Sequence, residues 1–414
     1  MRVFIVGFLL LTGGITLAQE LDSIKIDIPK DPRFGEYNRP YLEFKTRAGV
    51  ASRQWTSEQL VSFFYSDFLD EQVKDDLMEN GAAGLSLGYI QNLDIRFVYS
   101  GHYKSRLLPL PMRSIYMYNR SYTTLELPPD LLRLFLYGNR ATAGVEQDIG
   151  DFSYQSWFFS GIGHQMTFMV DTFPVSFGLS LVAAHTLDKH QINNAGLRTR
   201  TDGSALEFNG QYNFGQSGAQ GSYGITGWGL STNIESAERF DKHEIRAGIY
   251  DFGVVYMPDW NEVNRDSSFV FEGLDIGSIL DLSEDGFSNL LDSLQDGVVG
   301  TEDGAKWQLL PFNLRMNYRY HIDKKQFAYM DLQYLYLPNY RLRATLGYGY
   351  AWKRFEARSG FGYGGFNGYS WNLALNWKLN KYLRLQGGLT NMFGIVTPAL
   401  SGGTIGHFSI RYYF

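Results

Sequence analysis

The sequence predicts an all-β protein, a transmembrane antiparallel β-barrel of about 14 strands within a range of roughly 12 to 16. Three observations support this prediction. The chain ends in a segment of alternating apolar and polar residues, similar segments recur along most of it, and the first 18 residues are typical of an export signal. Segments of about 9 to 11 alternating residues are long enough to cross a bilayer as tilted strands.

The carboxyl-terminal segment is the clearest of these strands. Phe408, Ile410, Tyr412 and Phe414 fall on one face, because successive side chains in a strand point to opposite sides. We expect this face to contact lipid and the intervening residues to face a wet interior. A terminal aromatic residue is also the kind of tag that the barrel-insertion machinery of Gram-negative bacteria reads, so these four residues are the predicted insertion signal.

The amino terminus predicts export. A basic start, an apolar stretch over 3–11 and small residues over 16–18 form a secretory signal, so the mature chain should begin near Gln19. The alternative is a single membrane anchor, which requires about 20 apolar residues, and this stretch is shorter. The chain has no cysteine, which excludes a disulfide and a lipid-modified cysteine.

Composition narrows the class of protein. The chain of 414 residues contains 45 Gly, 28 Tyr and 30 Phe, and its mean hydropathy of −0.23 excludes a bundle of membrane helices. Glycine at strand bends and aromatic girdles at two water interfaces would give this profile. The net charge of −6 is unevenly spread, because residues 259–306 hold twelve acidic and two basic residues. An acidic insertion over 258–308 therefore interrupts a mildly basic chain.

The alternating segments must close into a barrel if they cross a membrane. The pattern is clearest over 313–320, 341–352, 369–379 and 382–392. A soluble sandwich can alternate in the same way, but an open sheet edge in hydrocarbon would leave backbone groups unpaired. Since both termini of such barrels lie in the periplasm, the direction of each strand follows from its position in the chain.

Counting strands back from the carboxyl terminus assigns each connection to one side of the membrane. The turns at 202–203, 323–325, 353–354 and 380–381 are predicted to be periplasmic, and the connections 258–308, 337–340 and 364–368 to open on the outer side. The count gives 13 strands from about residue 163 onward and one more over 93–99.

Three segments are predicted to be helical, in a chain divided into a signal peptide 1–18, an N-terminal segment 19–83 and a barrel 84–414. Thr56 and Gln59 form a capping box, so 57–79 is expected to be an amphipathic helix in an N-terminal plug. An excursion over 101–162 contains a second candidate at 129–137, and the acidic insertion contains a third. Each could stop the lumen, cap its mouth or decorate a loop.

Two groups of residues resemble chemical sites. Within the insertion, an oxygen-rich series has nearly the spacing of a calcium loop: Asp281, Ser283, Asp285, Asn289 and Asp292. Its last ligand is Asp rather than Glu, and a capped acidic helix that associates loosely with cations explains the same residues. His185 and His190 lack the spacing of a zinc-binding helix face, and Ser160 and His164 lack a nucleophile motif. We therefore expect no metal site, no cofactor and no enzymatic activity.

The polar faces of the strands carry a row of mostly basic residues that we expect to line the lumen. They are Arg315, Arg319, Asp331, Arg341, Arg343, Glu356, Arg358, Lys378, Arg384 and Arg411. Unpaired like charges in a narrow bore repel one another, so these residues should meet water, anions or an acidic partner. Either the interior is simply solvated, or the acidic insertion or the plug docks against this basic wall and closes the bore.

Five short segments carry a resemblance to a known family. They are Asp67–Asp70 running into Lys74–Leu77, Leu127–Leu132 running into Leu136–Asn139, Tyr250–Gly253, Phe269–Ile276 and Leu389–Gly394. Together they resemble a Bacteroidetes family of outer-membrane β-barrels of unknown function, allied to the fatty-acid-transporter-like (FadL-type) barrels. The resemblance implies a barrel with an N-terminal plug region and handling of hydrophobic cargo. An Asn-Pro-Ala turn common near the start of the fatty-acid transporters is missing here.

Two functions are compatible with these observations. The first is a plugged outer-membrane channel or transporter for hydrophobic or small solutes, gated by movement of the plug. The alternative is a non-transporting barrel subunit of a secretion, assembly or surface complex. Expected partners are outer-membrane lipid, the barrel assembly machinery and, for the second function, other outer-membrane proteins, with no nucleic acid. A stable partner after mild detergent extraction would favour the second function, and a lone monomer that holds lipid the first.

If the acidic insertion or the plug closes the bore by docking on the basic wall, neutralising the paired charges should raise ion conductance. The docked segment would then lose the ion pairs that hold it in the bore. Conductance in planar bilayers measures this directly. Unchanged conductance would count against docking.

Overall fold

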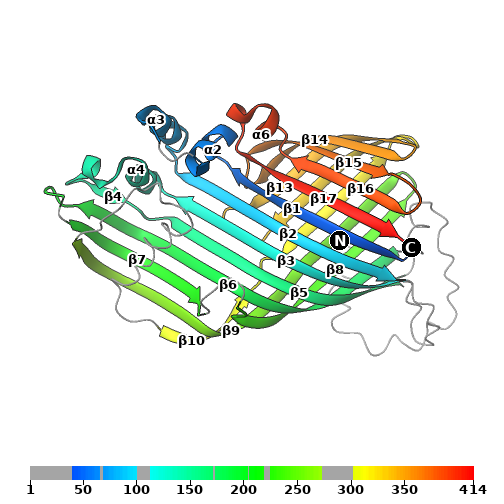
Figure 1. Ribbon diagram of the computed structural model, residues 1–414, viewed down its shortest axis with the longest axis horizontal. Coiled ribbons are helices and arrows are strands. Elements are labelled where there is room, and N and C mark those ends of the chain that lie inside the picture. The colour runs from blue at the N-terminus through cyan, green and yellow to red at the C-terminus, as the bar shows by residue number, and fades with distance from the viewer. Residues whose placement is uncertain are drawn as a thin grey trace.

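The computed structural model describes residues 40–65, 69–99, 112–170, 173–203, 205–218, 224–272 and 302–414. In these residues one antiparallel sheet curls round and closes on itself (Figure 1). Closure occurs at β1 (Tyr41–Ser52), which pairs with β17 (Gly403–Tyr413) on one side and with β2 (Leu85–Tyr99) on the other. A closed cylinder leaves no open edge in this part of the sheet, as hydrocarbon requires.

Fourteen of the 17 strands in the sheet form the barrel. Besides β1, β2 and β17 they are β3 (Met112–Leu127), β5 (Phe152–Val170), β6 (Phe173–Thr199), β8 (Gly227–Phe240), β9 (His243–Glu272), β11 (Asn313–His321), β12 (Gln326–Leu335), β13 (Arg341–Trp352), β14 (Phe355–Gly365), β15 (Tyr369–Lys378) and β16 (Leu383–Thr390). Neighbouring strands round the barrel all pair in antiparallel orientation. The predicted fold class and number of strands are therefore confirmed.

The other three strands, β4 (Glu146–Asp148), β7 (Ala205–Ser217) and β10 (Glu302–Leu309), lengthen the sheet beyond the barrel at one end. This is possible because β6 and β9 are 27 and 30 residues long. Each of them pairs with β8 over its first part and with β7 over its second part, while β10 continues the line of β11 along the other edge of β9. In Figure 1, β7 lies at the left, paired with the second parts of β6 and β9.

The two ends of the barrel differ. One end, called the turn end here, carries both ends of the described chain and tight turns such as 241–242 and 353–354. The other, the loop end, carries the extension, the longer connections and the helices. These are α2 (Ser57–Tyr65), α3 (Glu71–Asn80), α4 (Pro129–Tyr137) and α6 (Phe393–Val396), with short 3-10 turns η3 (Asn139–Thr142) and η5 (Pro398–Leu400). Among the described helices, none combines the length and apolar character needed to span a bilayer.

The outer face of the barrel wall is apolar and the inner face is polar. The exposed outward residues include Leu179, Leu181, Leu346, Phe361 and the carboxyl-terminal Phe408, Ile410, Tyr412 and Phe414. Ser409 and Tyr413, which alternate with this last group, are buried. A soluble protein keeps most such large apolar side chains in its core, so this exposed band is a lipid-facing surface.

Aromatic rings lie flat on the inner wall where glycine leaves room for them. Tyr118 on β3 covers Gly161 on β5, where an added Cβ atom would lie 2.3 Å from Cζ of the ring. Tyr329 on β12 covers Gly347 on β13 in the same way, at 2.5 Å. The Tyr118 hydroxyl reaches across β5 and β6 to Ser231 Oγ on β8, at 2.8 Å. Glycine on the inner face therefore lets long aromatic side chains bridge several strands.

The sequence-based count reaches fourteen strands with a different membership. It includes β7 and β10, which continue the lines of β8 and β11, and it omits β1 and β3. The barrel thus begins at Tyr41, inside the segment 19–83 assigned to the plug, and β3 with the first part of β5 lies inside the excursion 101–162. Tyrosines on the inner face of β3 hide its alternation, because both faces then contain large, partly apolar residues.

The helices predicted at 57–79 follow the first barrel strand rather than precede the barrel. They are two short helices, α2 and α3, at the loop end. Trp55 Nε1 donates to the Leu77 carbonyl at 2.9 Å, and Leu132 of α4 lies close to Gly81 at the end of α3. Leu60 of α2, Leu77 of α3 and Leu132 of α4 are buried in one apolar cluster, so the three helices share cover on this side. Val61 and Phe64 of α2 stay exposed.

One turn lies at the opposite end from its prediction. Asp202–Gly203 joins β6 to β7, and the Gly203 N–H donates to the Arg200 carbonyl at 2.8 Å. Because β6 starts at the turn end and runs through the whole extension, this turn belongs to the loop end. The turns at 323–325, 353–354 and 380–381 lie at the turn end, and 337–340 and 364–368 lie at the loop end.

Gly161→Ala should lower the free energy of unfolding by about 1–3 kcal/mol, because the new methyl group overlaps the Tyr118 ring. Gly387→Ala is the matched control: its added Cβ meets no atom closer than 3.8 Å and should have little effect. Urea titrations of the protein in detergent, followed by tryptophan fluorescence, measure both. Equal stability of the two variants would contradict the packing described for β3 and β5.

Candidate functional site

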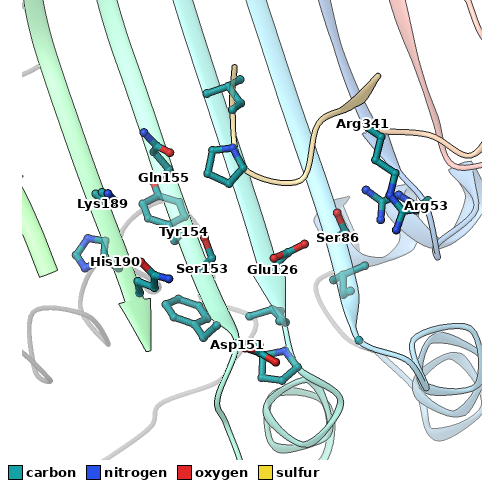
Figure 2. A pocket seen from close by; sticks show the side chains of 18 of the residues that line it. Arg53, Ser86, Glu126, Asp151, Ser153, Tyr154, Gln155, Lys189, His190 and Arg341 are labelled. Carbon is teal, nitrogen blue, oxygen red and sulfur yellow. The ribbon is translucent and has the colours of Figure 1, made fainter. Parts of the chain in front are cut away.

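A cavity of about 1030 Å³ lies at the loop end of the barrel. The loop-end parts of β2, β3 and β5 and the middle of β6 form one side of it, and the connections β10–β11 and β12–β13 form the other (Figure 2). Its lining includes the exposed residues Asp151, Lys189, Gln191 and Arg341, so it is open to solvent. Its size is at the upper end of the roughly 300–1,000 Å³ enclosed by small-molecule sites.

Apolar side chains from three connections fold into the barrel mouth next to this cavity. They are Leu310 from β10–β11, Leu337 and Tyr340 from β12–β13, and Phe366 from β14–β15, and all four are buried. We call them the loop plug. They join one buried cluster that includes wall residues from β17 round to β9. Side chains from distant parts of the wall therefore meet through the loop plug, and the bore is occupied at this level.

Polar contacts also attach these connections to the mouth, including backbone hydrogen bonds from Leu310 N–H to the Gly253 carbonyl and from Tyr336 N–H to the Phe312 carbonyl. Arg53 Nη2 donates to the Asn339 carbonyl at 2.8 Å, and Asn367 Nδ2 donates to the Gly402 carbonyl at 2.6 Å. The Phe366 ring covers Gly88 on β2, where an added Cβ would lie 2.2 Å from the ring. The side chains of the loop plug are thus held by apolar packing.

Further toward the turn end, Arg120 on β3 connects distant strands. Its Nε donates to Asp251 Oδ2 on β9 at 2.9 Å, and its Nη2 donates to Asp94 Oδ1 on β2 at 2.7 Å. The guanidinium also lies over the Tyr118 ring, 4.7 Å from its centroid. Because β5, β6 and β8 separate β3 from β9 in the sheet, the ion pair with Asp251 spans part of the bore.

An irregularity in β8 and β9 positions Asp251. Its φ is +60°, a left-handed conformation that Asp tolerates better than most residues, and the β8–β9 register shifts between Thr232 and Ile234. Asn233, at this shift, accepts from the Asp251 N–H at 2.7 Å and donates to Tyr116 Oη at 3.0 Å. The bulge therefore turns an acidic side chain inward and holds it against Arg120.

Near the turn end, cross-strand neighbours form a charged row. Lys378, Arg384, Arg411 and Glu43 occupy directly opposed positions on β15, β16, β17 and β1. Opposed residues share one face of a sheet, so all four point into the bore. Arg411 Nη2 lies 2.8 Å from Glu43 Oε1, and its guanidinium lies over the Tyr41 ring.

A second group of predicted lumen residues is paired within the wall. Arg319 Nη1 lies 3.7 Å from Glu356 Oε1, and Arg358 Nε lies 3.5 Å from the same atom. One carboxylate therefore serves two guanidinium groups. Arg343 differs, because its Nε is buried without a hydrogen-bond partner among the described residues.

The last three predicted lumen residues lie in separate surroundings. Arg315 lies over the Tyr250 ring, 5.4 Å from its centroid. Asp331 accepts a hydrogen bond from Asn317 Nδ2. Arg341 does not join either group, because it begins β13 at the loop end and lines the cavity there.

Several acidic and basic residues of the interior were not predicted. They are Glu43, Asp94, Arg120, Glu244 and Asp251. Glu244 lies 2.8 Å from Arg246 Nη2. Alternation of charged and apolar residues over 42–47 is the signal that could have revealed β1, whereas nothing in the sequence marks the bulge that turns Asp251 inward.

The predicted calcium motif, Asp281 to Asp292, lies outside the described residues, as does the central part of the acidic insertion. The described ends of the insertion extend β9 and β10, where Lys306 contacts Glu262. Docking of the insertion in the lumen therefore stays a prediction. Across the described ranges, no three His, Asp or Glu side chains gather as metal ligands would.

The structure pairs Ser160 with His185 rather than with His164. Ser160 Oγ and His185 Nε2 are 2.8 Å apart, and His185 Nδ1 lies 3.1 Å from the Gly224 carbonyl. A catalytic triad requires a carboxylate at that ring nitrogen, and here a backbone carbonyl occupies the position. His190 lies in the cavity wall instead.

No protein-family model and no curated relative matches the chain. Among solved structures, the toluene transporter TodX of Pseudomonas putida is similar, with 9% identity, a TM-score of 0.45 and coverage of 91% of this chain and 89% of that one. The Ralstonia pickettii toluene transporter TbuX has 9% identity, a TM-score of 0.43 and coverage of 91% and 90%. A Pseudomonas aeruginosa FadL homologue gives the same four values. So few identical residues leave the function to be argued from this chain itself.

Asp251→Asn should lower the free energy of unfolding by about 3–5 kcal/mol, because the buried Arg120 would lose a counter-charge. The control is Glu71→Gln, which removes an exposed ion pair with Lys74 and should cost less than about 0.5 kcal/mol. Urea unfolding in detergent measures both. If Asp251→Asn lowers the free energy of unfolding no more than the control does, the ion pair across the bore contributes nothing to stability.

Proposed function

We propose that the protein is an outer-membrane channel of a Gram-negative bacterium that admits hydrophobic or other small solutes from the loop end and is closed by its loop plug. One observation supports this most directly: a solvent-open cavity lies next to a plug made of short connections. A solute bound in the cavity would touch the plug, because Leu337 is part of both.

The proposed orientation follows from the difference between the two ends. Short turns and both termini belong on the periplasmic side of such barrels, so the loop end faces the external medium. Export by the predicted signal at 1–18 and insertion guided by Phe414 and its neighbours are part of the same proposal. The partners are then outer-membrane lipid around the apolar band and the assembly machinery during biogenesis.

The loop plug is suited to act as a gate. Its four residues lie on connections between strands, so movement of Leu337, Tyr340 and Phe366 would leave the strand ladders of the barrel paired. Leu310 is more firmly held, because its N–H donates to the Gly253 carbonyl of β9 at 2.9 Å. Beyond them the bore is lined by charged and hydroxyl groups that water can solvate. The ion pair between Arg120 and Asp251 crosses part of this polar bore and would limit the size of the solute.

Replacing both Leu337 and Phe366 by Ala should raise single-channel conductance several-fold, because it removes the apolar contacts that fill the mouth. The control is Tyr369→Ala, which truncates a 78% exposed ring just beyond the same connection and should leave conductance unchanged. Planar bilayer recordings measure both. If the double variant conducts like the unmodified protein, the loop plug is not the barrier.

A further inference from the structure

The charged groups of the cavity are sorted by sign. Arg53 and Arg341 lie side by side at one end, and Ser86 separates them from Glu126, with Asp151 further along the wall (Figure 2). Among the described residues none of these four charged side chains forms an ion pair. Two cationic groups and two anionic groups thus face one space without neutralising each other directly.

Polar atoms around this space lack partners. Ser86 Oγ, Trp157 Nε1 and His190 Nδ1 have no hydrogen-bond partner among the described residues, although their side chains are 3%, 2% and 7% exposed. Arg53 Nε also lacks a hydrogen-bond partner among the described residues. Buried polar atoms are nearly always satisfied in native proteins, so these four atoms mark the wall behind the cavity surface as an unusually polar one.

The two guanidinium groups would be stabilised by an anion. Burial lowers the pKa of Arg53, the neighbouring charge of Arg341 lowers it further, and the Glu126 carboxylate only partly offsets these effects. Arg53 nevertheless stays protonated at neutral pH, because the guanidinium pKa starts so high. One carboxylate between the two side chains would relieve their repulsion and could accept hydrogen bonds from their terminal guanidinium nitrogens. Paired arginines with planar donors are well suited to bind a carboxylate.

The remaining lining is apolar and aromatic. Phe152, Trp157 and Leu187 line the cavity together with Leu337 of the loop plug. Such surfaces can hold an apolar or aromatic side chain of the ligand. A wholly apolar ligand fits poorly, because it would desolvate the charged groups that line the cavity without replacing their hydrogen bonds to water.

We propose that the cavity binds a zwitterion of the amino-acid or short-peptide class, with its carboxylate at Arg53 and Arg341 and its ammonium group at Glu126 and Asp151. The apolar side chain of the ligand would then rest on Trp157 and the loop plug. This assignment rests on the proposed channel function, since it names the class of solute that the same cavity would receive.

Isothermal titration of the full-length protein in detergent tests the proposal with the tripeptide Ala-Phe-Ala. We expect the free tripeptide to bind, and its N-acetylated and C-amidated forms to bind about tenfold or more weakly, because each lacks one charged contact. Decanoate serves as an apolar monoanion and should also bind more weakly than the tripeptide. Equal binding of the capped peptides, preference for decanoate, or no binding of any probe would each overturn the proposal.

Two variants assign the ends of the ligand. In Arg341→Gln the free and amidated peptides should bind with similar affinity, and in Glu126→Gln the free and acetylated peptides should do so. Arg341→Lys keeps the positive charge and should restore part of the preference for a free carboxylate. Arg354→Gln at the turn end and Glu79→Gln on α3 are controls that change the same charges elsewhere and should behave like the unmodified protein.

Failure of this proposal is distinguishable from failure of the channel function. If the Leu337 and Phe366 double variant gains conductance while no peptide binds, the channel stands and the ligand class is wrong. If the peptide binds with the expected dependence on both charges but conductance never changes, the cavity is a binding site without a gate.

Discussion

The structure depends on closure of the sheet at β1. In hydrocarbon every backbone N–H and C=O group needs a partner within the protein, and β1 provides one by pairing with β17 and β2 at once. The same strand turns Glu43 toward Arg411 inside the bore while its apolar residues face outward. Closure of the backbone therefore also assembles the interior charges, because alternating side chains on β1 serve both purposes.

The number of strands determines how the interior can be filled. Side chains can fill the interior of an eight-stranded barrel, whereas barrels of roughly 16 to 18 strands leave an aqueous channel. Fourteen strands fall between these cases, so short side chains on the wall would leave a passage. This protein instead uses long side chains laid over glycine, a cross-bore contact from Arg120 to Asp251, and connections that fold into the mouth.

The sequence predicts the barrel well and its irregular features poorly. Period-two alternation is a local property, so strands such as β15 and β16 and the lipid-facing residues of β17 can be recognised directly. β3 is missed because Tyr116, Tyr118 and Tyr122 make its inner face look apolar. β7 and β10 alternate like crossing strands, and only the tertiary pairing with β6 and β9 shows that they extend the sheet. The cavity is unpredictable for the same reason, since its walls come from connections distant in sequence.

The loop plug explains why occupancy of the cavity and opening of the bore should be coupled. Burial of a large apolar side chain contributes roughly 1.5–3 kcal/mol, so moving Leu337 and Tyr340 into water would cost several kcal/mol and keep the open state rare. A ligand shifts this equilibrium only by the difference between its affinities for the two states. A ligand that binds beside Leu337 can supply that difference if its side chain replaces plug contacts with the wall. The opening energy would then come from the solute, and an empty barrel would stay closed.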